Sequence, residues 1–410
     1  MTIVRRGTLM PLAAIVLTAL NLRTAVTGFP PLLDMIGDEL GFGPSLYGLL
    51  GTLVTACFAV FGLLSAAVAR RIGLDVAIAI AVALTTTGLV LRSFSSDPGA
   101  LVVSTIVALV GVGSSNVLVV PLVKKYFSDH LKAMSSLYLA LLQVGQFVAP
   151  LIAVPVALAS GWRWALGMWA IPTGVAAALW IVLAVRALRM QPGAAEPTGT
   201  ADRIRGAWRT PLLWAMVLML GMTALNVYAL ITWLPTILVD AGADPASGGA
   251  LLSLFSMFGL LAAFVVPPLT VRLRNPFPIV VVCTVLMALG YVGLLLAPGE
   301  GAVAWVTLLG LGVSTFPMCL TLVNVRTRTT GGSTALSGAM QGLGYGIACV
   351  GPLGIGLLYE ISGGWGSSYA VLFASLVVLL VSGAVACRPV MLEDQVADLA
   401  ERRGESAPVS

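Results

Sequence analysis

A single arginine interrupts the first long apolar segment of this chain. Arg23 is the only charged residue in the stretch from Gly7 to Leu33. A helix over this stretch, rising about 1.5 Å per residue, would cross a bilayer core roughly 30 Å thick. A guanidinium near the middle of such a span costs about 3 kcal/mol or more unless it faces a cavity or a partner. The position of Arg23 therefore indicates a functional site.

The flanking residues place Arg23 close to the centre of this span. Pro11 near its start and Asp34 at its end put the midpoint about 3 Å from Arg23 along the helix axis. Reaching an interface from that depth is difficult, which leaves an anion ligand facing a cavity or a buried hydrogen-bonding group. The planar fork of five N–H donors suits a small carboxylate or a linear anion, so we expect the first role.

Other polar and aromatic residues in apolar segments could complete a substrate shell. Thr27 lies one helical turn after Arg23 and shares its face, whereas Asn21 lies about 200° away. Buried amides need partners, so hydrogen bonding between helices is the alternative role for them, and Trp233 could instead fill a helix interface. The candidate substrate-binding residues are Arg23, Thr27, Asn116, Gln143, Tyr228, Thr232, Trp233, Gln341 and Tyr345.

The composition predicts that membrane helices position these residues. Apolar residues make up 59% of the 410 residues, charged residues only 10%, and the mean hydropathy is +1.01, which excludes an ordinary soluble protein. We expect an all-α polytopic membrane protein with twelve transmembrane helices. Asp75 and Arg92 bracket the shortest span, and we expect both side chains to reach the headgroups. The segments lie at 9–33, 45–69, 75–93, 100–123, 134–160, 164–185, 211–239, 248–271, 277–298, 302–325, 334–359 and 367–387.

The distribution of basic residues predicts the orientation. Of the 22 lysines and arginines, nineteen fall in loops on one side of the predicted membrane, while only Arg92 and Arg163 fall on the other. This bias predicts a multi-pass protein of the cytoplasmic (inner) membrane with both termini cytoplasmic. No Asp or Glu lies deep in a segment, so facilitated diffusion, anion exchange and proton symport through Asp34 or Glu360 are all compatible with the sequence.

Several function classes are excluded by what the sequence lacks. No lysine follows a glycine, so there is no phosphate-binding loop for ATP, and the single histidine and five scattered cysteines make no metal-binding pattern. The basic residues form no continuous face for nucleic acid. We therefore expect no enzyme activity, no cofactor and no metal; the expected partners are a small-molecule substrate and the lipid bilayer, and the chain is expected to be a monomer.

Internal similarity divides the chain into two halves. The pattern Asn21-x5-Thr27-x2-Pro30 recurs 205 residues later, beginning at Asn226, and makes Tyr228 and Thr232 the equivalents of Arg23 and Thr27. The glycines at 338, 342 and 346 have the spacing of a helix-packing seam, and the prolines at 30, 31, 121, 235 and 352 should bend or end helices. The expected organisation is a six-helix half at 1–185, a linker at 186–210, a second half at 211–387 and a tail at 388–410.

Two such halves joined by a basic loop resemble the major facilitator superfamily. The signature loop between its second and third spans is degenerate here: it keeps Arg70 and Gly73, while Ser65 and Ala69 replace the first glycine and the aspartate. The candidate gating residues of this loop are Arg70, Gly73 and Asp75. The run from Asn21 through Arg23 to Asp34 is similar to the first span of the cyanate and 2-nitroimidazole transporter family. This resemblance implies alternating-access transport of cyanate-like anions or small nitrogen-containing compounds.

Two other functions remain as alternatives. Gly145-x3-Ala149-Pro150-x2-Ala153 loosely resembles the fifth-span signature of drug/proton antiporters, which would imply multidrug efflux. A membrane sensor that keeps the carrier fold without transporting would need a signalling domain, but only 22 residues follow Arg388.

Overall fold

The computed structural model describes residues 9–190 and 206–401, and within these ranges it contains helices and no strands. Among the described residues, twelve helical segments are long and apolar enough to cross a membrane, and each overlaps one of the twelve predicted from the sequence. The predicted all-α, twelve-helix membrane fold is therefore confirmed. Parts of the predicted linker and tail, at 191–205 and 402–410, lie outside the described residues.

The helices group into two compact units, which do not coincide with the two halves of the sequence. Unit 1 comprises Met1–Thr198 and Ile231–Ser256, and unit 2 comprises Gly199–Leu230 and Met257–Ser410. Two helices, α9 (Pro211–Asp240) and α10 (Pro245–Arg272), are therefore divided between the units.

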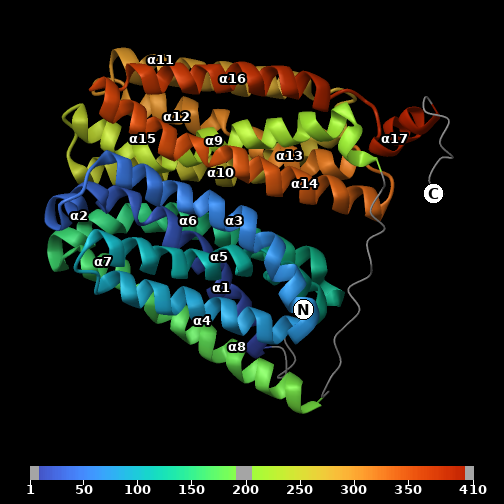
Figure 1. The fold of residues 1–410 in the computed structure, drawn as a ribbon, viewed down its shortest axis with the longest axis horizontal. Coiled ribbons are helices and arrows are strands. Elements are labelled where there is room, and N and C mark those ends of the chain that lie inside the picture. Colours follow the sequence, from blue (N-terminus) through green and yellow to red (C-terminus); the bar gives the residue numbers. More distant parts are fainter. Residues whose placement is uncertain (1–8, 191–205, 402–410) are drawn as a thin grey trace. The chain divides into compact units, whose positions relative to one another are not determined.

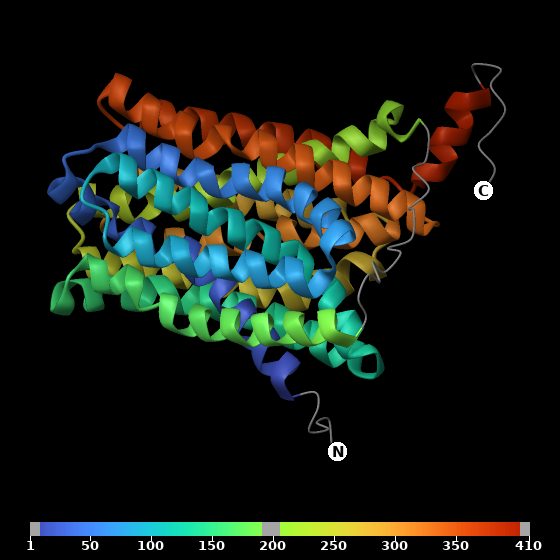
Figure 2. The same ribbon diagram turned by 60° about the horizontal axis from the view of Figure 1, so that its bottom comes forward.

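Unit 1 is built around its first helix. In Figures 1 and 2 the helices of this unit run alongside one another, with α1 packed against α6, α8 and α5, and α4 packed against α5 and α8. The helices are α1 (Leu9–Thr27), η1 (Pro30–Leu32), α2 (Leu33–Leu40), α3 (Pro44–Ile72), α4 (Leu74–Ser93), α5 (Pro98–Tyr126), η2 (Ser128–His130), α6 (Leu131–Ser160), α7 (Trp162–Gly167) and α8 (Ala170–Met190).

Unit 2 contains parts of α9 and α10, the spans that follow them and a short terminal helix. Its α11 packs against both α12 and α16 (Figure 1). The remaining helices are η3 (Ala207–Arg209), α11 (Phe277–Leu296), α12 (Ala302–Gly312), α13 (Thr315–Val325), α14 (Thr330–Ala348), α15 (Val350–Ser362), α16 (Gly366–Ala386) and α17 (Leu392–Glu401).

The first span is broken soon after Arg23. Helix α1 ends at Thr27, a 3-10 turn begins at Pro30, and α2 continues the segment to Leu40. Neither Pro30 nor Pro31 has an N–H group, so the α-helical hydrogen bonds cannot continue through them. Pro121 and Pro235, by contrast, lie inside α5 and α9.

Close backbone contact explains some glycines but not those of the predicted seam. A methyl group added at Gly145 of α6 would overlap the carbonyl oxygen of Leu20 in α1. No described atom lies within 4 Å of a methyl group added at Gly338 or Gly346, so the predicted packing role for these two glycines is wrong. The glycines of this region that do approach α9 are Gly344 and Gly351.

We expect Gly145→Val to destabilise the protein by about 1–3 kcal/mol, because the added side chain would push α6 away from α1. Thermal unfolding of the detergent-solubilised protein, followed by tryptophan fluorescence, measures this effect. Gly346→Val is the matched control and should leave the unfolding midpoint nearly unchanged. Equal midpoints for the two variants would contradict the prediction.

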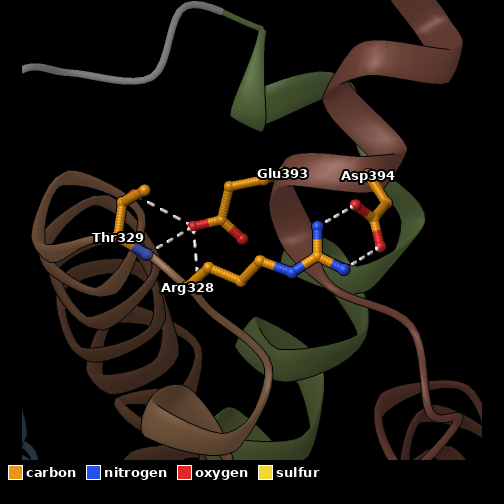
Figure 3. A network of polar contacts seen from close by, with 4 residues as sticks. All are labelled: Arg328, Thr329, Glu393 and Asp394. Carbon is orange, nitrogen blue, oxygen red and sulfur yellow. Dashed lines mark hydrogen bonds and ion pairs between the residues drawn. The ribbon is translucent and has the colours of Figure 1, made fainter. Parts of the chain in front are cut away.

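The terminal helix α17 binds the ends of two spans in unit 2. The Glu393 carboxylate accepts hydrogen bonds from the backbone N–H of Arg328 and from the backbone N–H and hydroxyl of Thr329, each at 3.0 Å, just before α14 begins (Figure 3). Asp394 pairs with the Arg328 guanidinium, while Gln395 accepts from the backbone N–H of Leu212 at the start of α9. Three consecutive residues thus hold the segment before α14 and the start of α9, where Gln395 satisfies an N–H group that the first turn of the helix leaves unpaired.

These contacts make the stability contributed by Glu393 depend on pH. Burial raises the pKa of Glu393, but hydrogen bonds from its own backbone and from Thr329 and Arg328 outweigh burial and hold the pKa below its usual range. The contribution is therefore complete above about pH 4.3, the value for an unperturbed glutamate, and is lost as the pH falls through the lowered folded-state pKa.

We expect Glu393→Gln to lower the thermal midpoint at pH 7 and to remove this acid-dependent part of the stability. The difference from wild type should stay constant between pH 8 and about pH 5, then shrink below about pH 4.3. Differential scanning fluorimetry across this range tests the sign. Glu401→Gln, at the far end of α17, is the control. A difference that grows on acidification would contradict the assignment.

Candidate functional site

The Arg23 side chain of α1 lies near side chains of α3 and α6 in unit 1. It is half-buried, and its guanidinium carbon lies 5.6 Å from the ring centroid of Phe58 in α3, within the range of a cation–π contact. Its charge also acts electrostatically on the phenol of Tyr138 in α6. The Tyr138 hydroxyl lies 3.5 Å from the backbone carbonyl oxygen of Asn116 in α5, to which it donates. We call Arg23, Phe58, Asn116 and Tyr138 the Arg23 cluster.

The Arg23 cluster combines one positive charge with neutral polar and aromatic surfaces. The Asn116 side chain is half-buried, whereas Phe58 and Tyr138 are buried. The carboxylates of unit 1 occur at or beyond helix ends in the sequence, away from the middle of α1, α3, α5 and α6. This arrangement can bind a small anion through the guanidinium and contact its apolar or aromatic part through the rings.

One predicted site residue, Thr27, lies next to the cluster on the α1–α6 contact. Thr27 is buried, and its hydroxyl hydrogen is placed to be shared between the carbonyl oxygens of Arg23, at 3.1 Å, and Gln146, at 3.2 Å. Thr27 therefore links α1 to α6. Gln143, one turn before Gln146 in α6, is half-buried.

A second group of predicted residues comes together in unit 2. The rings of Tyr228 in α9 and Tyr345 in α14 meet edge to face with centroids 6.2 Å apart, and both side chains are buried. Gln341, one turn before Tyr345, is half-buried and donates to the Ser337 hydroxyl at 2.9 Å. The repeat equivalent of Arg23 is thus part of an aromatic pair.

Thr232 and Trp233 belong to unit 1 rather than to this group. Both are buried, and the Trp233 ring lies 6.1 Å from that of Tyr47 in α3. One turn further along α9, the Thr236 hydroxyl donates weakly to the Asp34 carboxylate at 3.4 Å. Of the two roles considered for Trp233, its surroundings favour filling a helix interface.

The two repeat-related asparagines have different partners. Asn226 donates to the Met222 carbonyl oxygen at 2.7 Å and to the Ser375 hydroxyl at 2.8 Å, and it accepts from the Tyr291 hydroxyl at 2.7 Å. It therefore connects α9 to α11 and α16. Asn21 instead donates to the Leu17 carbonyl oxygen within α1, at 2.8 Å.

The loop-motif residues have separate roles in the structure. Arg70 is exposed near the end of α3, and Gly73 ends that helix with φ of 89°, a conformation that favours glycine. Asp75 accepts from Lys125 at 3.1 Å and from the Tyr126 hydroxyl at 2.6 Å, which ties the start of α4 to the end of α5.

The expectation that Asp75 and Arg92 reach the headgroups is wrong. Asp75 is only 4% exposed and Arg92 only 1% exposed. Asp75 is buried because the side chains of Lys125 and Tyr126 both bind its carboxylate. Arg92 turns into unit 1 because it finds an acceptor there, the carbonyl oxygen of Ala25 in α1.

Sequence comparison identifies the family. The model of the Major Facilitator Superfamily matches residues 14–349, which is most of the chain. The chain belongs to the Major Facilitator Superfamily. As a member of this superfamily it is a multi-pass membrane protein and a secondary transporter of a small solute, and its relatives are transporters rather than enzymes.

Two Escherichia coli transporters are similar to this superfamily member over nearly its whole length. A 2-nitroimidazole transporter is 32% identical over 356 residues, covering 86% of this chain and 89% of the relative. A cyanate transport protein is 26% identical over 375 residues, covering 90% and 95% of the two chains. Both relatives match the family that Arg23 and its flanking residues resemble.

Solved structures of this superfamily share the fold at low sequence identity. A nucleoside transporter aligns with a TM-score of 0.74 at 13% identity, covering 92% of this chain and 99% of the other. A bacterial homologue of the lysosomal transporter Spinster aligns with a TM-score of 0.69 at 17% identity, covering 97% and 98%. These likenesses show the fold alone.

Sequence reasoning missed two members of the Arg23 cluster. Phe58 appears in the repeated pattern Phe58-x2-Phe61-Gly62-Leu63-Leu64, but that pattern gave no reason to place it beside Arg23. Tyr138 had a weaker signal, a polar hydroxyl within the fifth apolar segment. Both become neighbours of Arg23 only when the helices pack.

We expect Asn226→Ala to destabilise the protein by about 1–3 kcal/mol, because it leaves the buried Tyr291 and Ser375 hydroxyls with fewer hydrogen-bond partners. Thermal unfolding midpoints measure the loss. Asn116→Ala, at a half-buried side chain of the Arg23 cluster, is the matched comparison and should cost less stability. A larger loss from Asn116→Ala would contradict the structural role of Asn226.

Proposed function

We propose that this transporter carries a small anion and that Arg23 is its charge anchor. The observation that supports the proposal most is the Arg23 cluster, where a half-buried guanidinium near the middle of the first span meets side chains of α3 and α6. A cation at that depth raises the free energy of the folded protein unless it faces a cavity or a partner. A negatively charged solute is such a partner.

In this proposal anion binding itself promotes transport. Enclosing the Arg23 guanidinium away from water is unfavourable, and a bound anion offsets much of that cost. Binding therefore favours the closed state through which alternating access must pass. Phe58 and Tyr138 would contact the uncharged part of the solute, while the Asn116 side chain supplies a further polar group.

The proposed substrates are cyanate-like anions or small nitrogen-containing compounds. The two relatives named for 2-nitroimidazole and cyanate support this class, as does the match of residues 21–34 to their family. The bias of lysine and arginine supports a location in the cytoplasmic membrane with both termini cytoplasmic. We further propose that the transporter works as a monomer, with no ATP and no cofactor.

We expect Arg23→Gln to reduce uptake of cyanate into proteoliposomes by about 100-fold, because a charge-assisted contact to a desolvated anion is worth about 3 kcal/mol. Arg23→Lys keeps the charge without the planar fork and should be intermediate. Initial rates with labelled cyanate, normalised to folded protein, measure both effects.

The matched control is Arg163→Gln. Arg163 pairs with Glu39 where both side chains are exposed, so its loss should leave uptake near the wild-type rate. An Arg23→Gln protein that folds and transports cyanate at the wild-type rate would rule out the proposed anchor. Drug resistance on expression that is indifferent to Arg23 would point instead to multidrug efflux.

A further inference from the structure

A second arginine of unit 1 is buried at the broken end of the helix that carries Arg23. Arg92, in the last turn of α4, is only 1% exposed. One of its terminal nitrogens, Nη1, donates to the carbonyl oxygen of Ala25 at 3.1 Å, and its guanidinium carbon lies 4.6 Å from the ring centroid of Phe29. From the sequence alone we expected this residue only to reach a headgroup.

The break in α1 provides the acceptor. Helix α1 ends at Thr27, and the Gly28 N–H donates to the Thr24 carbonyl oxygen, so the Ala25 carbonyl lies in the final turn, beyond that bond. The last carbonyl groups of a helix carry a partial negative charge and need donors, which a cationic side chain near the C-terminus can supply. Arg92 supplies one at Ala25.

Arg92 contacts α1 away from the Arg23 side chain. Ala25 follows Arg23 by two residues, which places it about 200° further around the helix and about 3 Å further along the axis. Arg23 points toward Phe58 of α3, whereas Arg92 comes from α4 and meets the broken helix end. Arg23 and the carbonyl group that binds Arg92 thus lie within one turn of α1, and the two arginines have different partners.

The burial of Arg92 is only partly compensated within the described residues. Its Nε and Nη2 atoms are buried and have no hydrogen-bond partner there. A buried cation without an ion pair is a poor source of stability, and an apolar residue of similar size often replaces such a group without loss. Its interaction with the end of α1 therefore suggests a purpose other than stability.

We propose that Arg92 is a positioning residue for anion transport: it holds the broken end of α1 and thereby fixes the Arg23 guanidinium within the Arg23 cluster. This inference rests on the proposed function, since Arg92 acts through Arg23. Without Arg92 the Ala25 carbonyl group loses the guanidinium donor. The hydrogen bond from the Thr27 hydroxyl to α6 then remains as a side-chain contact that holds this end of α1.

Unit 2 contains a matched arginine that serves as a control. Arg326 is 4% exposed and donates from Nη2 to the Cys387 carbonyl oxygen at 2.7 Å, and from Nε to that of Ala386 at 3.4 Å. It therefore binds the end of α16 as Arg92 binds the end of α1. Helix α16 carries none of the candidate substrate-binding residues.

The test compares arginine variants in proteoliposomes with cyanate as the probe, measuring half-saturation concentration, maximal rate and thermal midpoint. Arg92→Gln should raise the half-saturation concentration at least tenfold, and Arg92→Lys, which keeps the charge, about threefold. Arg326→Gln should lower the thermal midpoint and leave the half-saturation concentration within twofold of wild type.

A wild-type half-saturation concentration for folded Arg92→Gln would overturn the inference, as would equal changes in Arg92→Gln and Arg326→Gln. If Arg92→Gln does not fold, Arg92→Lys decides, and a wild-type value there overturns it.

Arg23→Gln in the same assay separates the two proposals. Loss of uptake in Arg23→Gln with unchanged Arg92 variants removes this inference alone. Wild-type uptake by Arg23→Gln removes the proposed anchor and this inference with it. Wild-type protein that shows neither cyanate uptake nor stabilisation by cyanate also removes both.

Discussion

The cost of keeping a guanidinium away from water shapes both units of this transporter. Arg23 meets the Phe58 ring and acts on the Tyr138 phenol, Arg92 meets the end of α1, and Arg326 meets the end of α16. Only Arg23 is half-buried, while the other two are nearly inaccessible. The proposed anion transport needs a cation that a solute can reach, and the difference in exposure distinguishes Arg23 from the two arginines that bind helix ends.

The spans could be predicted from the sequence because the bilayer requires a minimum length of apolar residues and excludes charged ones. Both the length and the charge of a segment follow directly from the order of its residues. Arg23 could be recognised as a candidate site residue because it is a charged residue within such an apolar segment. Phe58 and Tyr138 could not be assigned to it, because their approach depends on how α3 and α6 pack against α1. Arg92 was misplaced because a rule of charged residues near interfaces cannot foresee an acceptor created by a break in a neighbouring helix.

Residues at equivalent positions of the internal repeat have different roles in the structure. Asn226 binds Tyr291 and Ser375 on two neighbouring helices, whereas the equivalent Asn21 bonds within α1. Tyr228 packs on Tyr345, whereas the equivalent Arg23 carries a charge. Similar helices therefore support different local chemistry in the two halves, because a few side chains at equivalent positions have diverged.

The contacts of α17 fix the register of its first turn. Glu393, Asp394 and Gln395 follow one another in the sequence, yet each binds a different group near the ends of the spans. One residue inserted between Leu392 and Glu393 would rotate all three by about 100° around the helix axis relative to Leu392, which is buried. No compensating slide restores the set, because a shift along the axis leaves the rotation in place. The first turn of α17 should thus tolerate changes of length poorly, whereas the non-helical connection at 387–391 can absorb them.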